Sequence, residues 1–161
     1  MANEYWRKGV TKVYFTSAVI TAAPTQAQIT AATNLTGRIS SMDGWETAVE
    51  RIDTDNLGST FTSTITGPRT VGNAALTFLD TKNPAGLTPA AFDAVRTLLA
   101  NGARGTLMIM PYGSTTGERV EIWPVESSGP NDMITLGNEP AKFTVEFGVT
   151  GLPNKLLDIA V

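Results

Sequence analysis

The sequence predicts a mainly β domain, built as a two-sheet antiparallel β-sandwich or barrel-like fold with one flanking α-helix. One stretch, residues 88–101, carries a complete set of helix signals, whereas the segments on both sides are rich in β-branched and aromatic residues, as strands are. Twenty-four threonines beside 15 glycines also suit a β-rich chain with many turns. A short amphipathic helix is unstable alone in water, so this one must pack on the β structure.

The predicted helix has signals at both ends. Thr88 suits the N-cap, Pro89 suits the first helical position, and Gly102 suits a left-handed stop. Leu87 and Phe92 have the spacing of a hydrophobic staple. The apolar side chains recur at helical spacing and form one stripe that should face the sheet, made of Ala91, Phe92, Val95, Leu98 and Leu99. Asp93, Arg96 and Thr97 lie off that stripe.

The first third of the chain should form three strands and a short helix. Thr11–Ile20 is dense in β-branched and aromatic residues and predicts the first strand. Pro24–Leu35 opens with proline and keeps loose helical spacing, which predicts the short helix. Gly37–Ser41 and Trp45–Asp53 predict two strands, separated by a turn at Asp43 and Gly44.

Residues 54–72 form a long polar segment that suits no compact core. A loop of this length inside a domain is uncommon and usually functional, so we interpret it as a hairpin arm that projects from the body. The alternative is two ordinary strands with a turn near residues 56–58. If the arm binds a neighbour, its apolar anchors are Leu57, Phe61, Ile65 and Val71, and Arg69 is positioned to meet a carboxylate.

The second half of the chain predicts further strands around the helix. Arg104–Pro111 is apolar on both faces, as a central strand is, and Pro124 within Glu118–Glu126 should mark an edge or a bulge. Ala141–Val149 alternates cleanly between apolar and polar residues and predicts a half-buried strand. The remaining segments are a strand at Asn73–Asp80, a tight turn at Gly113–Gly117 and an apolar tail at Lys155–Val161, which forms a last strand or a clasp on a partner.

These elements predict a single domain over residues 1–161, with an N-terminal arm (1–10), the projecting loop (54–72) and a C-terminal clasp (155–161). Tyr5 and Trp6 in the N-terminal arm, and Leu157 and Ile159 in the clasp, are candidates for contacts with a neighbour. No apolar run approaches a membrane span and no signal peptide precedes the first strand, so we expect a soluble protein made in the cytoplasm.

Composition argues against several classes of function. A net charge of −3 disfavours a protein whose task is to grip nucleic acid. The chain has neither cysteine nor histidine, which removes the commonest metal ligands and the commonest general base. We therefore predict no enzyme, no cofactor and no metal. The pairs Glu46/Glu50 and Glu118/Glu121 have no convergent partners, and the calcium-loop-like start at Asp53 lacks its closing glutamate.

The three tryptophans leave one binding function open. Trp6, Trp45 and Trp123 could form a sugar-stacking platform on a β-sandwich, although tryptophan in a strand is more often core or interface. A carbohydrate-binding module therefore remains an alternative.

The order of segments resembles the tail-tube (major tail) proteins of long-tailed bacteriophages, over nearly the whole chain. The similarity begins with a first strand, the short helix PTQAQITAATNL and a Gly-Trp strand. It continues with an Asp-Asn-Leu-Gly-Ser loop, a Thr-Gly-Pro-Arg-Thr turn and a Leu-Thr-Phe strand. It closes with a helix ending RTLLANGARG, a Trp-Pro-Val strand and an Ala-x-Phe-x-Val-x-Phe strand.

The resemblance implies a structural virion protein of the phage tail, made in the host bacterial cytoplasm. Six copies would form a ring, the inner sheets would join in one β-barrel, and stacked rings would conduct the genome during ejection. Its partners would be other copies, the tape-measure, terminator and baseplate proteins of the tail, and DNA in transient non-specific passage, without membrane insertion. The alternative within this style is another ring-forming phage part, a tail terminator or a head decoration.

A water-filled conduit suits a strand with one polar face. We therefore expect the lumen wall to include the polar face of Ala141–Val149, together with an adjoining strand. The candidate lumen residues are Glu46, Glu50, Lys142, Thr144 and Glu146. The alternative places these carboxylates on the outer surface.

Overall fold

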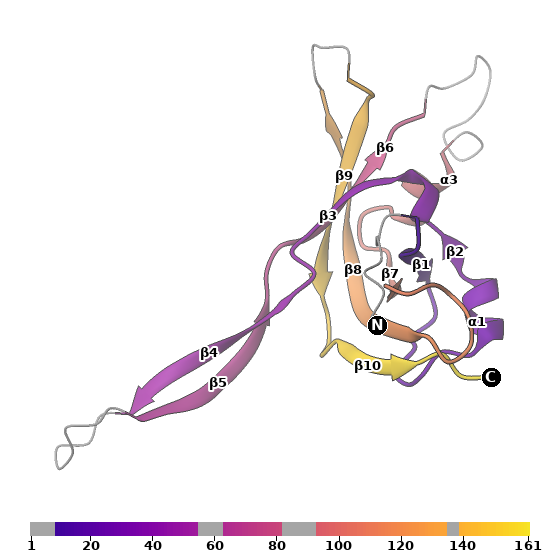
Figure 1. Ribbon diagram of the computed structural model, residues 1–161. Helices are drawn as coiled ribbons and strands as arrows, with labels where there is room; N and C mark the ends of the chain where they lie inside the picture. Colours follow the sequence, from indigo (N-terminus) through magenta and orange to yellow (C-terminus); the bar gives the residue numbers. More distant parts are fainter. Residues whose placement is uncertain (1–8, 55–62, 82–92, 135–138) are drawn as a thin grey trace, which may run out of the picture.

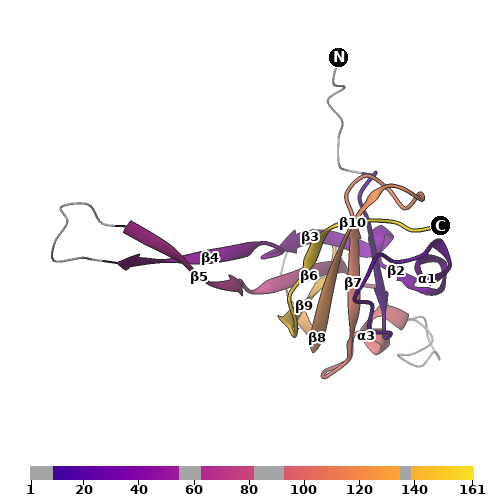
Figure 2. The same ribbon diagram turned by 90° about the horizontal axis from the view of Figure 1, so that it is seen from below.

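The computed structural model describes residues 9–54, 63–81, 93–134 and 139–161. The chain forms a β-rich body from which a long two-stranded ribbon projects to one side (Figures 1 and 2). The fold is mainly β, with antiparallel strands packed as in a β-sandwich, which confirms the predicted class.

The body is one curled antiparallel sheet of eight strands. The strand order is β2-β1-β7-β8-β9-β6-β3, and β10 pairs with β8 beside this path. The strands are β1 (Lys12–Thr16), β2 (Thr33–Asn34), β3 (Ile39–Asp43), β6 (Ala74–Leu79), β7 (Arg104–Met110), β8 (Arg119–Met133), β9 (Lys142–Val149) and β10 (Asn154–Asp158). The ribbon is a separate sheet of β4 (Thr47–Thr54) and β5 (Ser63–Val71).

Two hydrophobic cores lie on opposite faces of β7, as its apolar sequence predicts. The main core fills the inside of the curl, where Trp123 and Phe143 are fully buried and Trp45 packs edge-on against Trp123 at 5.3 Å. The second core lies on the other face of β7 and contains Met108, Met110, Val120, Ile122, Ile20, Ile29 and Ile159. Six of the seven residues of β7 are buried, which confirms it as a central strand.

The short first helix closes the second core. Helix α1 (Gln26–Ala31) begins with a capping box, in which the Thr25 side chain accepts from the N–H of Gln28 and the Gln28 side chain accepts from the N–H of Thr25. Its one buried residue, Ile29, is 1% exposed. The predicted helix within Pro24–Leu35 is therefore confirmed, and a 3₁₀ turn, η1 (Thr36–Arg38), follows it.

The second helix is shorter than its sequence signals predict. Helix α3 spans Ala94–Leu98, and its N-cap is Asp93, whose backbone is not helical (φ −136°, ψ 79°). A continuous helix over residues 88–101 is therefore wrong, although the predicted cap at Thr88 and the staple residue Phe92 lie outside the described residues. The apolar stripe is confirmed where it is described, because Val95 and Leu99 are buried in the main core. Gly102 (φ +79°) lies in the turn beyond the helix rather than at its cap.

Helix α3 begins directly after Asp93 because the carboxylate of this residue serves two structural roles. It accepts from the N–H of Arg96 as the N-cap, and it also binds the guanidinium of Arg38 at 2.6 and 3.1 Å. Arg96 joins the same cluster, lying 3.2 Å from Asp93, 3.0 Å from Asp80 and 2.6 Å from Asp132. The sequence placed Asp93 outside the apolar stripe of the helix, but the structure buries its side chain completely.

This ion cluster sets the charge of Asp93. Burial alone would raise the pKa of the Asp93 carboxyl, but the hydrogen bonds from Arg38 and from the Arg96 N–H, with the two guanidinium charges, hold that pKa below its ordinary value of 3.8. The cluster therefore joins η1, α3 and the far end of β8 through a carboxylate that stays ionised.

Pro124 lies in an interior strand, so the edge position predicted for it is wrong. One side of β8 pairs with β7 throughout residues 121–126, while its other side changes partner from β10 to β9 next to Pro124. The Pro124 carbonyl accepts from the N–H of Thr150 in the link between these two partners. A residue without an N–H is tolerated at such a change of partner. The bulge of β8 lies further on, between Ser127 and Pro130.

The remaining predicted strands are present, but with different bounds: β1 covers only the first half of Thr11–Ile20, β3 begins after the 3₁₀ turn, and β8 continues to Met133. The turn between β3 and β4 contains Gly44 with φ +73°, a conformation that favours glycine. Strand β9 alternates as predicted, with Phe143, Val145 and Phe147 buried. The C-terminal tail forms the last strand, β10.

Candidate assembly surfaces

Four strands of the body form a sheet with one polar face. These are β3, β6, β9 and the second half of β8, residues 127–133. On the face away from the main core, Thr77 of β6 and Thr144 of β9 share a hydrogen bond of 3.1 Å, and Glu146 is exposed nearby on β9. Lys142 on the same face lies 3.9 Å from Glu139. We call this surface the polar face.

The same four strands leave two unpaired edges in the described part of the chain. Strand β3 pairs only with β6, and residues 128–133 of β8 pair only with β9. Because every neighbouring pair is antiparallel, the two edge strands run in opposite directions. Unpaired edges of this kind are templates for pairing with another chain.

The two-stranded ribbon is the arm, which we define as β4 and β5. It pairs from Thr47 opposite Val71 out to Thr54 opposite Ser63, so it begins at Thr47 rather than at the predicted residue 54. A bulge opposite Glu50 accommodates Gly67 and Pro68. A side chain at Gly67 would crowd Glu50 and Ile52, with contacts of 3.1–3.2 Å from its Cβ, which accounts for glycine there.

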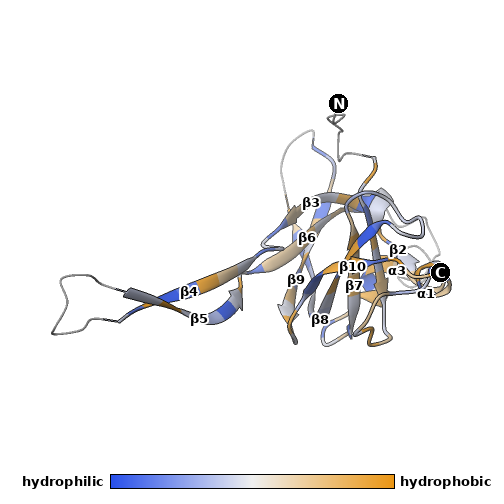
Figure 3. Cartoon of the chain, turned by 60° about the horizontal axis from the view of Figure 1, so that its bottom comes forward, coloured by the Kyte–Doolittle hydropathy of each residue, from blue (hydrophilic) through white to orange (hydrophobic). Residues whose placement is uncertain are grey.

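The two faces of the arm differ in chemistry. Ile52 and Ile65 are opposite each other in register, and Glu50 lies on the same face of β4 two residues away. The other face carries Val49 and Arg69 as a register pair. Ile52 is 43% exposed and Ile65 is 53% exposed, so the apolar pair is not covered within the chain. Figure 3 shows hydrophobic and hydrophilic positions mixed along this ribbon, away from the body.

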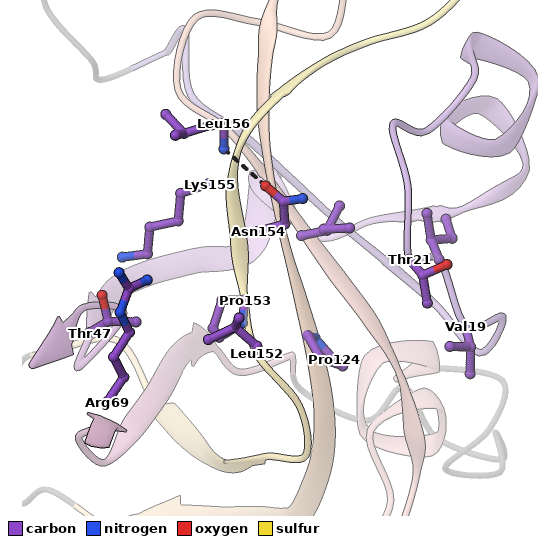
Figure 4. A pocket seen from close by; sticks show the side chains of 12 residues that line it. Val19, Thr21, Thr47, Arg69, Pro124, Leu152, Pro153, Asn154, Lys155 and Leu156 are labelled. Carbon is purple, nitrogen blue, oxygen red and sulfur yellow. Dashed lines mark hydrogen bonds between the residues drawn. The ribbon is translucent and has the colours of Figure 1, made fainter. Parts of the chain in front are cut away.

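A groove lies where the arm joins the body, which we call the arm-base groove. Its volume is about 450 Å³, and a neighbouring hollow of about 570 Å³ shares Thr47, Arg69, Leu152 and Pro153 with it. In Figure 4, Thr47, Arg69 and Lys155 lie on the arm side of the groove, while Val19 and Thr21 lie on the opposite side. Leu152, Pro153 and Pro124 lie between them.

The arm-base groove combines exposed apolar side chains with positive charge. Val19, Leu152 and Leu156 are 72–80% exposed, a high value for large apolar residues. The Lys155 ammonium lies 4.6 Å from the ring of Trp123 and donates to the Trp45 carbonyl, which fixes its position. No carboxylate in the described part of the chain pairs with Lys155 or Arg69, and the described residues that line the groove include no acidic one.

The predicted lumen residues fall into two groups. Lys142, Thr144 and Glu146 are together on the polar face of β9. Glu50 lies on the arm and Glu46 just before it, whereas the strands beside β9 are β6 and β8. The expected adjoining strand is therefore wrong, because β4 leaves the body to form the arm.

The predicted contact residues are also separated by the structure. Ile65 and Arg69 are exposed on the arm, whereas Val71 packs against the main core. Leu157 is half-buried against the second core, and Ile159 is 2% exposed within it, so the chain itself uses these side chains. Tyr5, Trp6, Leu57 and Phe61 lie outside the described residues.

Sequence reasoning missed the arm-base groove completely. Val19, Arg69 and the segment Leu152–Leu156 are far apart in the sequence, and only the fold brings them together. The Leu152-Pro153 pair, apolar but located at a turn, was the one local signal that could have indicated an exposed contact.

The two tryptophans in the described part of the chain form no platform for sugar stacking. Trp123 is fully buried and Trp45 packs on it, so these two rings form no exposed platform. Within residues 9–54, 63–81, 93–134 and 139–161, no group of three acidic, histidine or cysteine side chains could hold a metal ion. No helix in this described portion has the length and apolar character needed to cross a membrane.

Comparison with known protein families identifies a match. A family described as phage tail tube protein matches residues 1–160, which is nearly the whole sequence. Comparison with curated proteins gives no significant match.

Proposed function

The chain belongs to the phage tail tube protein family, and from that premise we propose that its copies close into rings that stack as a tube for DNA. The protein is a structural component of the phage tail. Six copies per ring is the number that the resemblance implies. The proposal adds the closed ring, the stacking and the conduction of the genome during ejection.

The observation that carries the proposal is the pair of unpaired edges on the four-stranded sheet. Since β3 and the second half of β8 run in opposite directions, β3 of one copy can pair antiparallel with β8 of the next. Repeating this contact head to tail uses two different surfaces of each copy and closes into a ring when the rotation allows. Closure of the ring would remove every edge of this sheet.

In such a ring the polar face turns toward the lumen. The main core covers the opposite face of β6 and β9, so the apolar side of this sheet is already buried within each copy. The polar face offers mainly small neutral groups, such as the Thr77–Thr144 pair, with the Glu146 carboxylate among them. The lysine of this face, Lys142, lies 3.9 Å from the Glu139 carboxylate. A wall without unpaired lysine or arginine clusters suits DNA that must slide, because each phosphate contact would hold it.

The arm supports the second part of the proposal, the stacking of rings. An isolated two-stranded ribbon is at best marginally stable in water, and this one exposes the apolar pair Ile52 and Ile65. Burial against a neighbouring copy would cover both. The ends of the tube would meet the tape-measure, terminator and baseplate proteins of the tail, and assembly would follow synthesis in the host cytoplasm.

Electron microscopy of the purified protein tests this function directly. We expect tubes with a central channel. Single rings would indicate a terminator or a decoration protein, and monomers at all concentrations would contradict the proposal.

A shortened arm tests the role assigned to it. Replacing residues 48–70 with an Asn-Gly turn keeps Thr47 and Val71, which are already paired, so circular dichroism should show an intact body. The same variant should form no long tubes. Ordinary tubes from the folded armless chain would show that stacking needs no arm.

A further inference from the structure

We propose that the arm-base groove is the receptor for the arm of a second copy, which inserts its Glu50–Ile52–Ile65 face. This inference rests on the proposed assembly of copies and names the two surfaces that meet. The occupant is a second copy of this chain, for the reasons that follow.

The charges of the two surfaces are complementary. The groove holds Arg69 and Lys155, which have no carboxylate partner in the described part of the chain. The Lys155 ammonium contacts the Trp123 ring and the Trp45 carbonyl, and neither contact supplies a negative charge. Two neighbouring cations without a counter-charge favour an acidic ligand. On the arm, Glu50 is exposed and lies next to the apolar pair.

The apolar parts of the two surfaces also match. Val19, Leu152 and Leu156 are exposed at the groove, and Ile52 with Ile65 is exposed on the arm. Each set alone leaves large apolar side chains in water, and contact between them would bury both. Each surface therefore combines exposed apolar side chains with charge. The charge is negative on the arm, at Glu50, and positive in the groove, at Arg69 and Lys155.

A chain cannot fill its own groove with this face. The groove includes Thr47 at the base of β4, whereas Ile52 is five residues further out, roughly 17 Å along an extended strand. The arm also runs away from the body (Figure 2). The inserted arm therefore comes from another copy.

Docking at the arm base makes the contact self-propagating. Thr47 and Arg69 belong to β4 and β5, so an incoming arm touches the root of the receiving copy's own arm. Binding would hold that arm in one direction, ready for the next copy. Because donor and receptor surfaces differ, the contact is heterologous and repeats from copy to copy.

Charge reversal in the full-length protein tests the contact. We expect Glu50→Arg alone, and Arg69→Glu with Lys155→Glu, to raise the concentration needed for assembly by roughly tenfold or more, since each places like charges together. An equal mixture of the two variants should assemble again, because each arm then meets a groove of opposite charge. Asp53→Arg is the matched control, being on the opposite face of the same strand, and should assemble as the original chain does.

The outcomes separate this inference from the proposed function. Because Lys155→Glu removes a contact with Trp123, Arg69→Glu alone serves as the second receptor variant, with thermal unfolding to verify its fold. Three results would contradict docking of the arm in the groove: normal assembly of Glu50→Arg, no recovery of assembly in the mixture, or an equal loss of assembly in Asp53→Arg. Tubes formed by the original chain would still support the proposed function in each case. DNA binding that disappears with Arg69→Glu would assign the groove to phosphates and also overturn it. Absence of wild-type tubes would count against the function itself.

Discussion

The body and the arm are built from the same antiparallel pairing, yet they bury very different amounts of their side chains. In the body, Trp123, Phe78 and Phe143 have no exposed surface and pack among buried residues from five strands and α3. In the arm, Ile52 and Ile65 are 43% and 53% exposed and contact mainly each other's strand. Backbone hydrogen bonds alone add little net stability, so the body owes its stability to burial and the arm lacks that source.

This difference indicates that the body determines the stability of a single copy, whereas the arm contributes to association between copies. A segment that stays extended without a core of its own gains its missing burial from another molecule. Substitutions in the body should therefore change the free energy of unfolding of a single copy, whereas substitutions in the arm should change only association. The predictions below test that separation.

Removal of Trp123 should have the largest effect on folding. Trp123→Ala leaves a cavity under Trp45 and removes the ring beneath Lys155. We expect the free energy of unfolding to fall by about 3–5 kcal/mol, measured by denaturant titration of an assembly-blocked chain. A loss below 1 kcal/mol would mean that the curled sheet is not held by this core.

Substitution of the buried Asp93 should have the second largest effect on the free energy of unfolding. Asp93→Asn keeps an N-cap but removes the ion pairs, and we expect a loss of about 2–3 kcal/mol at neutral pH, because breaking a buried pair is costly. The value stays moderate because the Arg38 and Arg96 side chains are 25% and 23% exposed and can hydrate.

The pH dependence of the same variant gives an independent measurement. The pKa of Asp93 is lower in the folded chain than its ordinary value of 3.8, so this stabilisation is complete above pH 3.8 and is lost as the pH falls through the folded value. The difference in stability between the original chain and Asp93→Asn should therefore shrink in strong acid. A difference that stays constant down to pH 2 would contradict the ionised cluster.

Features that depend on neighbouring residues could be predicted from the sequence, whereas contacts between distant segments could not. Local signals identified α1 and β9, because a capping box and strict alternation depend on neighbours within a few residues. The partners of Asp93 could not be predicted, since Arg38 is 55 residues away and the helical pattern placed Asp93 on the exposed side. The arm was predicted from its polarity but begins at Thr47, because residues 47–53 alone are typical of an ordinary body strand. The arm-base groove depends on segments from both ends of the chain, which no local pattern connects.

Truncation of the arm's apolar pair should leave folding almost unchanged. Ile52→Ala with Ile65→Ala removes half-exposed side chains that belong to neither hydrophobic core, so the free energy of unfolding should change by no more than about 1 kcal/mol. Assembly measured by sedimentation should nevertheless be strongly reduced. A destabilisation as large as that of Trp123→Ala would show that the arm is part of the cooperative body.

The smallest effect on both folding and assembly should come from the polar face. Glu146 is exposed on β9 and has no ion pair in the described part of the chain, so Glu146→Lys removes no contact that holds the body or the arm. Tubes should form with unchanged length, and thermal unfolding should match that of the original chain.

If this face lines the lumen, six copies per ring place a circle of ammonium groups against the phosphates, and counterion release makes such contacts favourable at low salt. Phage with these tubes should therefore eject DNA more slowly, and the delay should shrink as salt rises. Asp53→Lys is the matched control, because it makes the same change of charge on the arm, away from the polar face, and Asp53 has no ion pair in the described part of the chain. Unchanged ejection with Glu146→Lys at low salt would place the polar face outside the conduit.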